Sequence, residues 1–574
     1  MGRTMGDVWR DAVTAGRAYP AYLVERADGW AEVGWEEAGA RVDELAAGFL
    51  AAGVGPGDTV SILGRTRVEW ALCDFAAASI GAVTAPIYQT NSREECAHVL
   101  ADSGARLLVC EDSEQVEKTR GLPGPAEVVA MDPVPGVRSL AELADAGRSV
   151  GSERLAAARE AAGSEDVLTL IYTSGTTGPA KGCAITHANF VAEIEAVRQV
   201  AGLFAERDVV LLFLPLAHNF ARLVTFSAAA LGLTVAFLPE PTDVTRALGE
   251  VRPTTFPSVP RIYEKMHARV EASFAEATGV KRRLIDRSLA VGREAAARRE
   301  RGEALPAALR LQHRVADRLV FSKLKERLGG RMRVALSGGG PLAREIVEFF
   351  AACGIVILEG YGLSETTSGC TVNRPDAYRF GTVGLPLPGV ELRLADDGEV
   401  LVRGPTVFRG YHGRPEDTAA AVDPDGWLRT GDVGEVDADG FLAITDRKKE
   451  LIVTAGGKKI APQNLENALK ASPLVADAVV VGERRPYVVA LLTLDPDELS
   501  GTGEREARSA VEDVVTAVNA PLGRTEQIKR FAILPRPFAV EDGELTPTLK
   551  VRRRVIEERY REQIDALYAA PGER

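Results

Sequence analysis

The stretch 170–182, LIYTSGTTGPAKG, decides the fold expected for this chain. It opens with Leu170, Ile171 and Tyr172, the end of a short apolar run that is typical of a buried strand. A loop built only of Thr, Ser and Gly follows. Glycines let backbone N–H groups converge on phosphate oxygens, hydroxyls add donors, and a lysine adds positive charge. The stretch therefore predicts a strand that leads into a phosphate-binding loop, with donors from Thr173, Ser174, Gly175, Thr176, Thr177, Gly178 and Lys181.

The spacing of this loop differs from the mononucleotide-binding pattern GxxxxGK[ST], so the fold that accompanies that pattern is not inferred. An ordinary surface turn is the alternative, because clusters of Ser, Thr and Gly are common in loops. The other motifs of the chain bear on the choice.

The composition is that of a large globular protein. A chain of 574 residues exceeds what one hydrophobic core supports, and roughly three or four lobes of about 150 residues each are expected. The net charge of −12 and the pI of about 5.3 argue against nucleic acid as the main partner. Six cysteines without a CxxC pair indicate neither a disulfide framework nor a zinc site, which fits a reducing, cytoplasmic setting.

The N-terminal residues 1–16 contain no apolar core of signal-peptide length, and Gly6 stands where a myristoylation motif needs Ser or Thr. We therefore expect neither an export signal nor a lipid anchor. Residues 223–239 (LVTFSAAALGLTVAFLP) are apolar, but they are too short and too often interrupted by polar residues for a membrane span. A buried helix that ends at Gly232 and continues into a strand is favoured instead.

From Gly53 onward the chain alternates short apolar runs with helical stretches, which is the pattern of a layered α/β sheet. After the phosphate loop a further strand-like run ends at Pro215 and places His218 and Arg222 just beyond it. Ligands of open α/β sheets bind at this end of the strands. A hydrogen-bonded core histidine is the equally weighted alternative for His218.

Two later segments repeat the order of strand, glycine turn and helix. In residues 333–343 (RVALSGGGPLA), Pro341 stands where a first helical turn is expected. Residues 355–369 (IVILEGYGLSETTSG) contain Tyr361, a flat ring for stacking, and Glu365, a carboxylate able to hold Mg²⁺ beside phosphates. Helix capping is the alternative role for Glu365.

The predicted secondary structure changes toward the C-terminus. Strands and turns dominate residues 381–444, where Asp432 is a candidate acceptor for ribose hydroxyls. A compact αβ module begins near Arg447, and Gly456 and Gly457 mark a turn within it.

Residues 281–333 are helical in pattern and strongly basic, with sixteen Lys or Arg against six Asp or Glu. Such a segment can bind an anionic partner, for example coenzyme phosphates or a membrane surface. A solvated helical face is the favoured alternative, because arginine is a good helix former on surfaces.

Six motifs occur in one order along the chain: YTSGTTGPAKG, LPLAHNFAR, EGYGLSETT, WLRTGD, DRKKELI and TPTLK. Together they resemble the adenylate-forming (AMP-binding) superfamily of acyl-CoA synthetases, luciferases and peptide-synthetase adenylation domains, over roughly residues 20–560. The segments PIYQTNS, VPRIYEK and GTVGLPLPGVE, with the long helical insertion, are most similar to bacterial long-chain fatty-acyl-CoA synthetases. The resemblance implies an α/β fold. An N-terminal domain (1–446) of layered α/β subdomains and a β-rich subdomain would precede a small mobile α+β domain (447–574).

The resemblance also implies catalytic and metal-binding roles. The loop Thr173 to Gly178 and Lys181 would hold the β- and γ-phosphates of ATP, and Glu365 with Thr173 would hold Mg²⁺. Lys550 would bridge the carboxylate and the α-phosphate. The candidate catalytic residues are Lys550, Lys181, His218 and Arg222.

The same comparison implies the rest of the nucleotide site and the hinge. Asp432 would bind ribose, Arg447 would reach ribose or phosphate, and Lys449 would lie at the hinge between the two domains. The adenine pocket and the passage for CoA would involve Gly338, Gly339, Gly340, Glu359, Gly360, Tyr361, Gly362, Ser364, Gly456 and Gly457. Two positions depart from the family pattern. Ala180 stands where a proline commonly precedes the lysine, and Asp446 stands where many members have glycine.

The implied reaction is ATP-dependent activation of a long-chain fatty acid to acyl-adenylate and its transfer to coenzyme A. The reacting carboxylate and phosphate are both anions, so cations must lie where they meet. No GxSxG elbow occurs, so a hydrolase is not indicated. The alternatives are an acyl-adenylate former that loads a carrier protein, a CoA ligase for medium-chain or aryl acids, and a catalytically silent sensor on the same fold. Small molecules are the expected partners, peripheral membrane contact is an open alternative, nucleic acid is not expected, and the oligomeric state is open.

Overall fold

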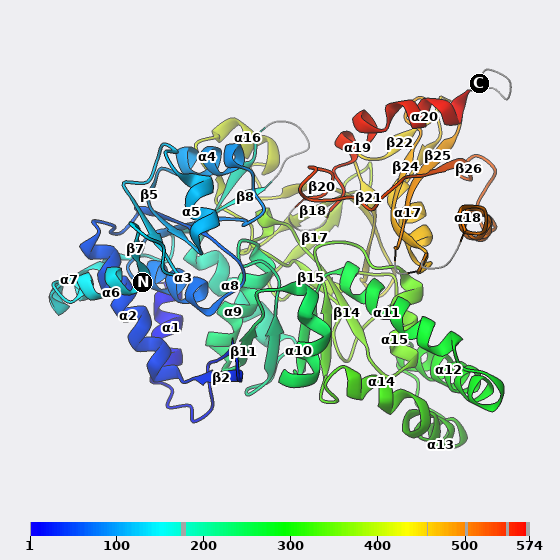
Figure 1. Ribbon diagram of the computed structural model, residues 1–574, viewed down its shortest axis with the longest axis horizontal. Helices are drawn as coiled ribbons and strands as arrows, with labels where there is room; N and C mark the ends of the chain where they lie inside the picture. The colour runs from blue at the N-terminus through cyan, green and yellow to red at the C-terminus, as the bar shows by residue number, and fades with distance from the viewer. Residues whose placement is uncertain are drawn as a thin grey trace.

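The computed structural model describes residues 2–173, 179–455, 457–496, 498–499, 503–546 and 550–569. Two large sheets with helices packed on them form the N-terminal part of the molecule (Figure 1). A smaller antiparallel sheet and a compact C-terminal unit follow. The layered α/β architecture predicted from the sequence is therefore confirmed.

The first large sheet holds the strand that precedes the predicted phosphate loop. Its order is β19-β9-β8-β4-β3-β5-β6-β7, and its strands are parallel except for β9, which is antiparallel to both neighbours. Thr173 at the end of β8 lies opposite Lys181 at the start of β9. The strands are β3 (Thr59–Leu63), β4 (Val83–Ile87), β5 (Ala105–Cys110), β6 (Glu127–Ala130), β7 (Arg138–Ser139), β8 (Val167–Thr173), β9 (Lys181–Thr186) and β19 (Gly410–Tyr411).

Helices of the first third of the chain pack on this sheet and at its border with the second. Ser92 shows why α4 begins where it does. Its hydroxyl oxygen accepts the N–H of Glu95, and the Glu95 carboxylate accepts the backbone N–H of Ser92. The helices are α1 (Met5–Thr14), α2 (Trp35–Ala51), α3 (Val68–Ser79), α4 (Arg93–Asp102), α5 (Ser113–Thr119), α6 (Leu140–Gly147), α7 (Ser152–Ala161) and α8 (His187–Gln199).

The second large sheet has the order β16-β15-β14-β13-β12-β10-β11-β1-β2. Its central strands from β14 to β1 are parallel, and antiparallel strands lie at both edges. Its strands are β1 (Tyr22–Arg26), β2 (Gly29–Val33), β10 (Val209–Leu212), β11 (Thr234–Phe237), β12 (Thr255–Ser258), β13 (Val334–Ser337), β14 (Ile357–Tyr361), β15 (Thr371–Val372) and β16 (Leu385–Pro386). The helices of this half are α9 (Asn219–Leu231), α10 (Val244–Val251), α11 (Pro260–Ala275) and α15 (Arg344–Ala352), with short 3₁₀ turns at Pro241–Asp243 and Ser364–Thr366.

One hydrophobic core runs through both sheets, and α3 and α9 are buried in it along most of their length. The apolar stretch 223–239 follows its prediction. The helix ends at Leu231, Gly232 takes a left-handed φ of 74°, and β11 begins at Thr234. Among the helices that the structure describes, none combines the length and the apolar character needed to cross a bilayer.

The β-rich segment is an antiparallel sheet of order β17-β18-β20-β21 with one short helix beside it. β20 and β21 form a hairpin whose register places Asp432 opposite Arg447. The elements are β17 (Glu391–Leu394), β18 (Glu399–Arg403), α16 (Pro415–Ala421), β20 (Leu428–Val436) and β21 (Leu442–Arg447).

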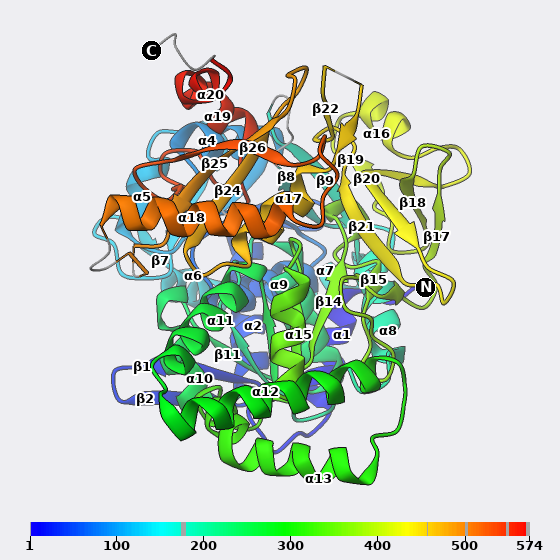
Figure 2. The same cartoon turned by 90° about the vertical axis from the view of Figure 1, so that its right-hand side faces the viewer.

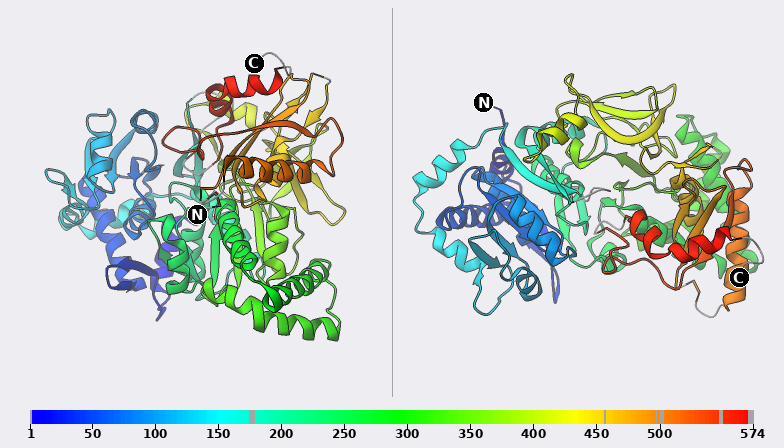
Figure 3. Two further views of the ribbon diagram at one scale, coloured as in Figure 1. Left: turned by 45° about the vertical axis from the view of Figure 1, so that its right-hand side comes forward. Right: turned by 90° about the horizontal axis from the view of Figure 1, so that it is seen from above.

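The C-terminal unit has hydrophobic clusters of its own on both faces of a three-stranded sheet. Figure 3 shows its elements, in orange and red, gathered on one side of the molecule and away from the blue N-terminal helices. They are β22 (Ile452–Val453), β23 (Lys459–Ile460), α17 (Pro462–Lys470), β24 (Val475–Val481), β25 (Val488–Leu494), α18 (Glu504–Asn519), β26 (Ile528–Ile533), α19 (Arg553–Arg559) and α20 (Arg561–Tyr568).

The basic segment folds into a helical hairpin that extends from the second sheet. Its two long helices run side by side at the lower edge of the molecule (Figure 2). The elements are α12 (Gly279–Glu300), α13 (Ala307–Ala316), a π-helical turn (Asp317–Phe321) and α14 (Ser322–Arg327).

One sequence prediction in this half is wrong. Pro341 does not open a helix, because α15 begins three residues later at Arg344 and Pro341 belongs to the glycine-rich turn after β13. Proline suits either place, since it fixes φ and lacks an N–H that would need a partner. The turn is therefore longer, and it leaves Gly338, Gly339 and Gly340 along the wall of a cleft.

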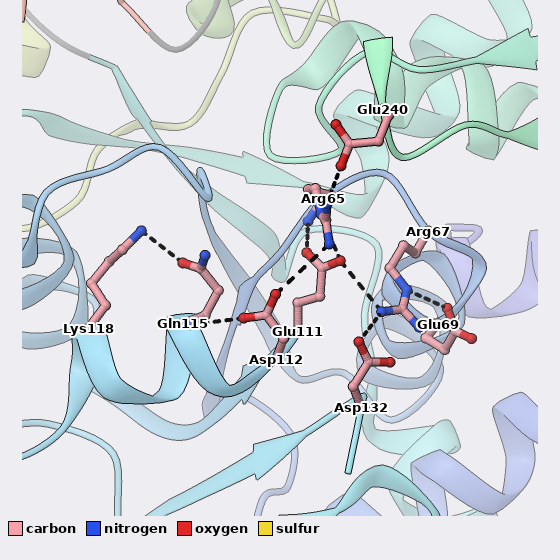
Figure 4. Close-up of polar contacts among 9 residues, drawn as sticks. All are labelled: Arg65, Arg67, Glu69, Glu111, Asp112, Gln115, Lys118, Asp132 and Glu240. Atoms are coloured by element: carbon pink, nitrogen blue, oxygen red, sulfur yellow. Dashed lines mark hydrogen bonds and ion pairs between the residues drawn. The ribbon is translucent and has the colours of Figure 1, made fainter. Parts of the chain in front are cut away.

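A polar cluster joins the two large sheets where β3 and β5 end (Figure 4). Glu111, only 1% exposed, accepts bonds from the backbone N–H and the Nε of Arg65, at 2.7 and 2.9 Å. Arg65 also pairs with Glu240, which lies beyond β11 in the other sheet. Arg67 pairs with Asp132 at 2.9 Å. Glu111 is thus the buried acceptor on which an inter-sheet contact depends.

We expect Glu111→Ala to lower the stability of the N-terminal part by about 1–3 kcal/mol, because the backbone N–H and the Nε of Arg65 lose their buried acceptor. Asp132→Ala in the same cluster is the matched control. Its carboxylate is 44% exposed, so its pair contributes at most about 1 kcal/mol. The measurement is the shift in thermal unfolding midpoint of the two variants. Equal shifts would contradict the role given to Glu111.

Candidate active site

A cleft of about 2580 Å³ lies between the N-terminal sheets and the C-terminal unit. The ends of β8, β13 and β14, the β20–β21 hairpin and the segment around Lys550 all contribute to its walls. Parallel strands present their carboxyl ends at one edge of a sheet, which is where ligands of such folds bind. The predicted site residues that the structure describes line this cleft, with the exceptions of Arg222 and Gly457.

The phosphate loop is described only at its two ends. Thr173 and Lys181 line the cleft, whereas Ser174, Gly175, Thr176, Thr177 and Gly178 lie outside the described residues. The Lys181 ammonium pairs with Asp417 at 2.7 Å and lies 5.3 Å from the centre of the Tyr411 ring. These contacts hold the lysine at the cleft wall, where an incoming phosphate could compete with Asp417 for its charge.

Glu365 occupies the 3₁₀ turn that follows β14, and its side chain faces the cleft. The Tyr411 hydroxyl donates a hydrogen bond of 2.7 Å to the Glu365 carboxylate. No bond from this carboxylate caps the turn among the described contacts, so the alternative role of a capping acid is not supported. Among the described contacts this carboxylate accepts one hydroxyl and forms no ion pair, so oxygen lone pairs remain for a metal ion.

Burial and the neighbouring Glu365 charge raise the pKa of Tyr411, which therefore stays a donor. Sequence reasoning missed Tyr411 and Asp417. Tyr411 lies on β19, a two-residue strand paired with β9, and Asp417 lies in α16. The aromatic residue in the run RGYHG was the available signal, but nothing local connects it to a loop some 230 positions earlier.

The glycine turns allow close approach of backbone to the cleft and to neighbouring chain. A Cβ on Gly338 would come within 3.3 Å of the Phe220 ring, and one on Gly362 would come within 1.8 Å of the Ser368 carbonyl oxygen. Gly339 has a left-handed φ of 80°. A side chain is therefore excluded at Gly362 for steric reasons, and the backbone conformation of Gly339 favours glycine. Gly340, Gly360 and Ser364 also line the cleft.

Glu359 lies on β14 at the cleft wall and is almost fully buried. Burial raises its pKa to about 8, so the carboxyl group is mostly neutral at pH 7. One of its oxygens has no hydrogen-bond partner among the residues that the structure describes. A buried polar atom without a partner at a cleft wall suits a ligand that brings its own donor or acceptor.

Tyr361, Asp432 and Arg447 form a connected group. The Tyr361 hydroxyl donates to one Asp432 oxygen at 2.7 Å, and Arg447 Nε lies 3.3 Å from the other. Burial raises the pKa of Asp432, while the Arg447 charge opposes the shift. The three side chains come from two different sheets and meet at the cleft, as the sequence resemblance implied for a ribose and adenine site.

Lys550 reaches this group from the C-terminal unit. Its backbone N–H donates to Thr546 Oγ1 at 3.0 Å, and the residue lines the cleft, with part of its surface open to water. Partial loss of hydration within the cleft and the positive charge of Arg447 lower its pKa to about 8, and the carboxylates of Asp432 and Glu365 oppose that shift. The lysine is thus a cation in the cleft that deprotonates more readily than usual.

His218 is the N-cap of α9 and lines the cleft. Its Nδ1 accepts the N–H of Phe220 at 3.1 Å, so the neutral ring carries its proton on Nε2. Loss of water contact and the Lys550 charge lower its pKa to about 3. The ring is therefore a satisfied cap that also borders the cleft, and its role in binding a ligand stays a prediction.

Arg222 is the exception among the predicted catalytic residues. Its side chain is fully buried in the core, where it pairs with both carboxylate oxygens of Asp74 and donates to Thr169 at 2.6 Å. Three aromatic rings surround the guanidinium. No reacting atom can reach it, so the catalytic role predicted for Arg222 is wrong. The ion pair with Asp74 on α3 holds it in the core, although it lies only four positions after His218.

The junction between the two parts is marked by lysines. Lys449 lines the cleft, and its neighbour Lys448 pairs with Asp397 and Glu399 at 2.6 and 2.9 Å. Gly457 has a left-handed φ of 77° with open space around its Cα, whereas Gly456 lies outside the described residues.

Apolar side chains form part of the cleft lining. They come from α9, from α11 and from the residue before α11. They are Phe220, Leu223, Val224, Val259, Ile262 and Met266.

Curated relatives match nearly the whole chain. The sequence is 41% identical over 560 residues to the long-chain-fatty-acid--CoA ligase FadD15 of Mycobacterium tuberculosis, which covers 94% of this chain and 92% of that protein. It is 30% identical over 599 residues to the long-chain-fatty-acid--CoA ligase ACSBG1 of Mus musculus, which covers 95% of this chain and 82% of that protein.

Solved structures agree with the fold at lower identity. The adenylation domain of a carboxylate reductase from Mycobacterium chelonae superposes with a TM-score of 0.79 at 24% identity, covering 99% of this chain and 92% of that one. ATP-bound MatB from Rhodopseudomonas palustris gives a TM-score of 0.72 at 23% identity, covering 98% and 100%. These likenesses establish the fold.

Family descriptions account for most of the sequence. The AMP-binding enzyme family matches residues 9–412, and the AMP-binding enzyme C-terminal domain matches residues 449–571. Matches of this extent, with the six motifs in order and their residues around one cleft, show that this chain belongs to the family of AMP-binding, adenylate-forming enzymes.

Proposed function

We propose that this protein is an ATP-dependent long-chain fatty acid–CoA ligase. The observation that carries the proposal is the composition of the cleft, whose walls combine Lys550, Glu365 and Asp432 with apolar side chains of α9 and α11. The polar groups suit a nucleotide and a carboxylate, and the apolar lining suits a hydrocarbon chain. Mycobacterial relatives that match 94% of this chain at 41% identity carry the same activity in their names.

In the first step the fatty carboxylate oxygen attacks the α-phosphorus of ATP, and pyrophosphate leaves. Lys550 and Lys181 carry positive charge at the two ends of the reacting phosphates, where it lowers the repulsion between anions. His218, neutral and with its proton on Nε2, is placed to donate a hydrogen bond to the carboxylate. Asp432 and Tyr361 orient the nucleoside. These groups position the substrates and offset their negative charge, and none of them needs to exchange a proton with a substrate.

Glu365 and Thr173 fit a magnesium ion. In phosphate sites Mg²⁺ is bound through one or two carboxylates, phosphate oxygens and water, which matches a single cleft carboxylate and a nearby hydroxyl. No cluster of three His, Cys, Asp or Glu that could hold a metal by itself occurs among the described residues. When bound, the ion would neutralise phosphate charge.

In the second step the thiol of CoA attacks the acyl carbon of the adenylate, forming the thioester and releasing AMP. Lys550 occupies the cleft in the first step, so the thiol needs a different arrangement of the C-terminal unit. We propose that residues 447–574 form a mobile domain that turns about Lys449 relative to residues 1–446. The contacts that hold it support this, since Arg261–Asp477, Lys470–Glu264 and Arg552–Glu95 are ion pairs with at least one partly exposed member.

The other candidates differ in acceptor or acid. An enzyme that loads a carrier protein is disfavoured because the β20–β21 hairpin before the hinge is short and carries no insertion. A medium-chain or aryl acid would cover less of the apolar lining of the cleft than a long-chain acid would. The cytoplasmic location with peripheral membrane contact and the absence of a nucleic-acid partner remain predictions.

A comparison of carboxylic acids of different chain length as substrates tests the function directly. With ATP and CoA supplied, we expect kcat/KM for C12 to C18 acids to exceed that for acetate and aryl acids at least tenfold, because each buried CH₂ contributes about 0.8 kcal/mol. Pyrophosphate release and thioester formation are measured in parallel. Faster turnover of aryl or short acids would overturn the long-chain assignment, and pyrophosphate without thioester would favour the carrier-loading alternative.

Glu365→Gln is expected to raise the Mg²⁺ concentration needed for half-maximal pyrophosphate release and to lower its maximal rate, because a neutral amide is a weaker magnesium ligand than a carboxylate. Glu345→Gln is the matched control, since it removes another carboxylate from the cleft wall. Both variants should unfold at the same temperature as the parent. An unchanged Mg²⁺ dependence in Glu365→Gln would refute the metal-binding role.

Lys550→Ala is expected to slow adenylation by roughly 10² to 10³, the range for loss of one transition-state donor. It should still convert supplied acyl-adenylate and CoA to thioester. Gly457→Leu should have the reverse effect, since its left-handed φ does not suit leucine and the turn is proposed to serve the second step. Similar losses of both half-reactions in both variants would contradict the proposed rotation.

The pH dependence of adenylation follows from Lys550. The protonated amine is the active form, so kcat/KM should be retained below the Lys550 pKa of about 8 and should fall as the pH rises through it. Lys550→Arg keeps its charge at much higher pH and should extend the plateau upward. The measurement is kcat/KM for ATP between pH 6.5 and 9.5, and an unchanged profile in Lys550→Arg would assign the pH dependence to another group.

A further inference from the structure

Exposed apolar side chains gather on the helical hairpin. Over the described residues, eight large aliphatic side chains are strongly exposed, and five of them lie between positions 280 and 319. They are Val280 (82% exposed), Leu284 (37%), Leu311 (63%), Val315 (50%) and Leu319 (48%). Scattered exposed aliphatic residues need no explanation, but this concentration on one insertion does.

Three of these residues form a stripe along α13 and the π-helical turn after it. Leu311, Val315 and Leu319 follow one another at intervals of four, which places them on one side of a helix. Ala316 and Val320 are buried and hold the segment against the rest of the hairpin. The stripe is therefore a second apolar face, pointing away from the packing face.

Arginines lie beside the stripe at each step. Arg310, Arg314 and Arg318 directly precede the three apolar residues and are exposed. None of the three forms an ion pair with any residue in the described part of the chain, in contrast to Arg282 and Arg298 on α12, which pair with Asp286 and Glu294. The charge of this row is free for an external anion.

We propose that this apolar and arginine-lined face of α13 docks the protein on a membrane surface that carries anionic lipids. A helix with aliphatic residues on one face and basic residues beside them lies in the interface of such a membrane, with the aliphatic residues among the acyl chains and the arginines at the headgroups. Nucleic acid would use the charge but not the aliphatic stripe. The inference rests on the proposed function in one respect, because long-chain fatty acids partition into membranes.

Vesicle co-sedimentation tests the proposal with the full chain. The parent should bind vesicles of phosphatidylcholine and phosphatidylglycerol (1:1), should bind less at 0.5 M salt, and should bind pure phosphatidylcholine weakly. The triple variant Leu311→Ser, Val315→Ser, Leu319→Ser should lose at least tenfold in vesicle partition. The variant Arg310→Gln, Arg314→Gln, Arg318→Gln should lose on the order of 100-fold on anionic vesicles, since each basic residue near the surface contributes about 1 kcal/mol.

The matched control is Leu394→Ser with Val436→Ser. These residues are 39% and 43% exposed and lie in the antiparallel sheet away from the hairpin, so binding should not change. All variants should keep the parent unfolding temperature and the parent rate of pyrophosphate release with vesicle-free fatty acid.

Vesicle binding by the triple variant equal to that of the parent would overturn the proposal, as would absence of binding by the parent. A larger molar mass of the parent in light scattering that falls to that of one chain in the triple variant would also overturn it, because the stripe would then be a contact between two copies. Vesicle binding by a protein that activates no fatty acid would uphold the surface and refute the proposed function.

Discussion

Asp432 is the residue on which the arrangement of the cleft depends. It stands on β20, faces Arg447 on the neighbouring strand, and accepts the Tyr361 hydroxyl from the end of β14 in another sheet. A buried carboxylate that loses a partner is costly, so these contacts restrict how the β-rich sheet can lie against the large one. The junction with the C-terminal unit follows directly after Arg447. The contacts of Asp432 with Arg447 and Tyr361 therefore also restrict where that unit begins.

The cations of the cleft are distributed between parts of the chain that meet only on folding. Lys181 stands on a strand of the first sheet, Arg447 at the end of the β-rich sheet, and Lys550 in the C-terminal unit. Bringing positive charges together in a partly dry cleft is unfavourable, as the lowered pKa of Lys550 shows. An anionic substrate relieves this repulsion. The cations of the cleft therefore suit phosphate and carboxylate groups, whose negative charge would offset their mutual repulsion.

Much of the fold and of the site could be predicted where local chemistry decides the structure. Gly232 ends a helix because the chain there takes a left-handed backbone conformation, which glycine adopts without strain. The run 170–173 is a strand because every residue in it is apolar or β-branched. Prediction failed where packing between distant segments decides. Arg222 lies in the same motif as His218, yet Asp74, some 150 positions earlier, binds it in the core. Tyr411 reaches Glu365 only because β19 joins the edge of the first sheet.

The charge pattern of the chain also could not be interpreted from the sequence without knowledge of the packing. Counting gives sixteen basic and six acidic residues between positions 281 and 333, and a solvated helical face explains that count as well as an anionic partner does. The count cannot separate arginines that pair within α12 from the row on α13 that does not pair. Nor can it show that the unpaired row borders an exposed aliphatic stripe, because helix period alone does not tell which of two apolar faces is covered. In the structure the face with Ala316 and Val320 is buried, whereas the face with Leu311, Val315 and Leu319 is exposed. The basic segment therefore has one defined side from which both its arginines and its exposed aliphatic residues can contact a partner.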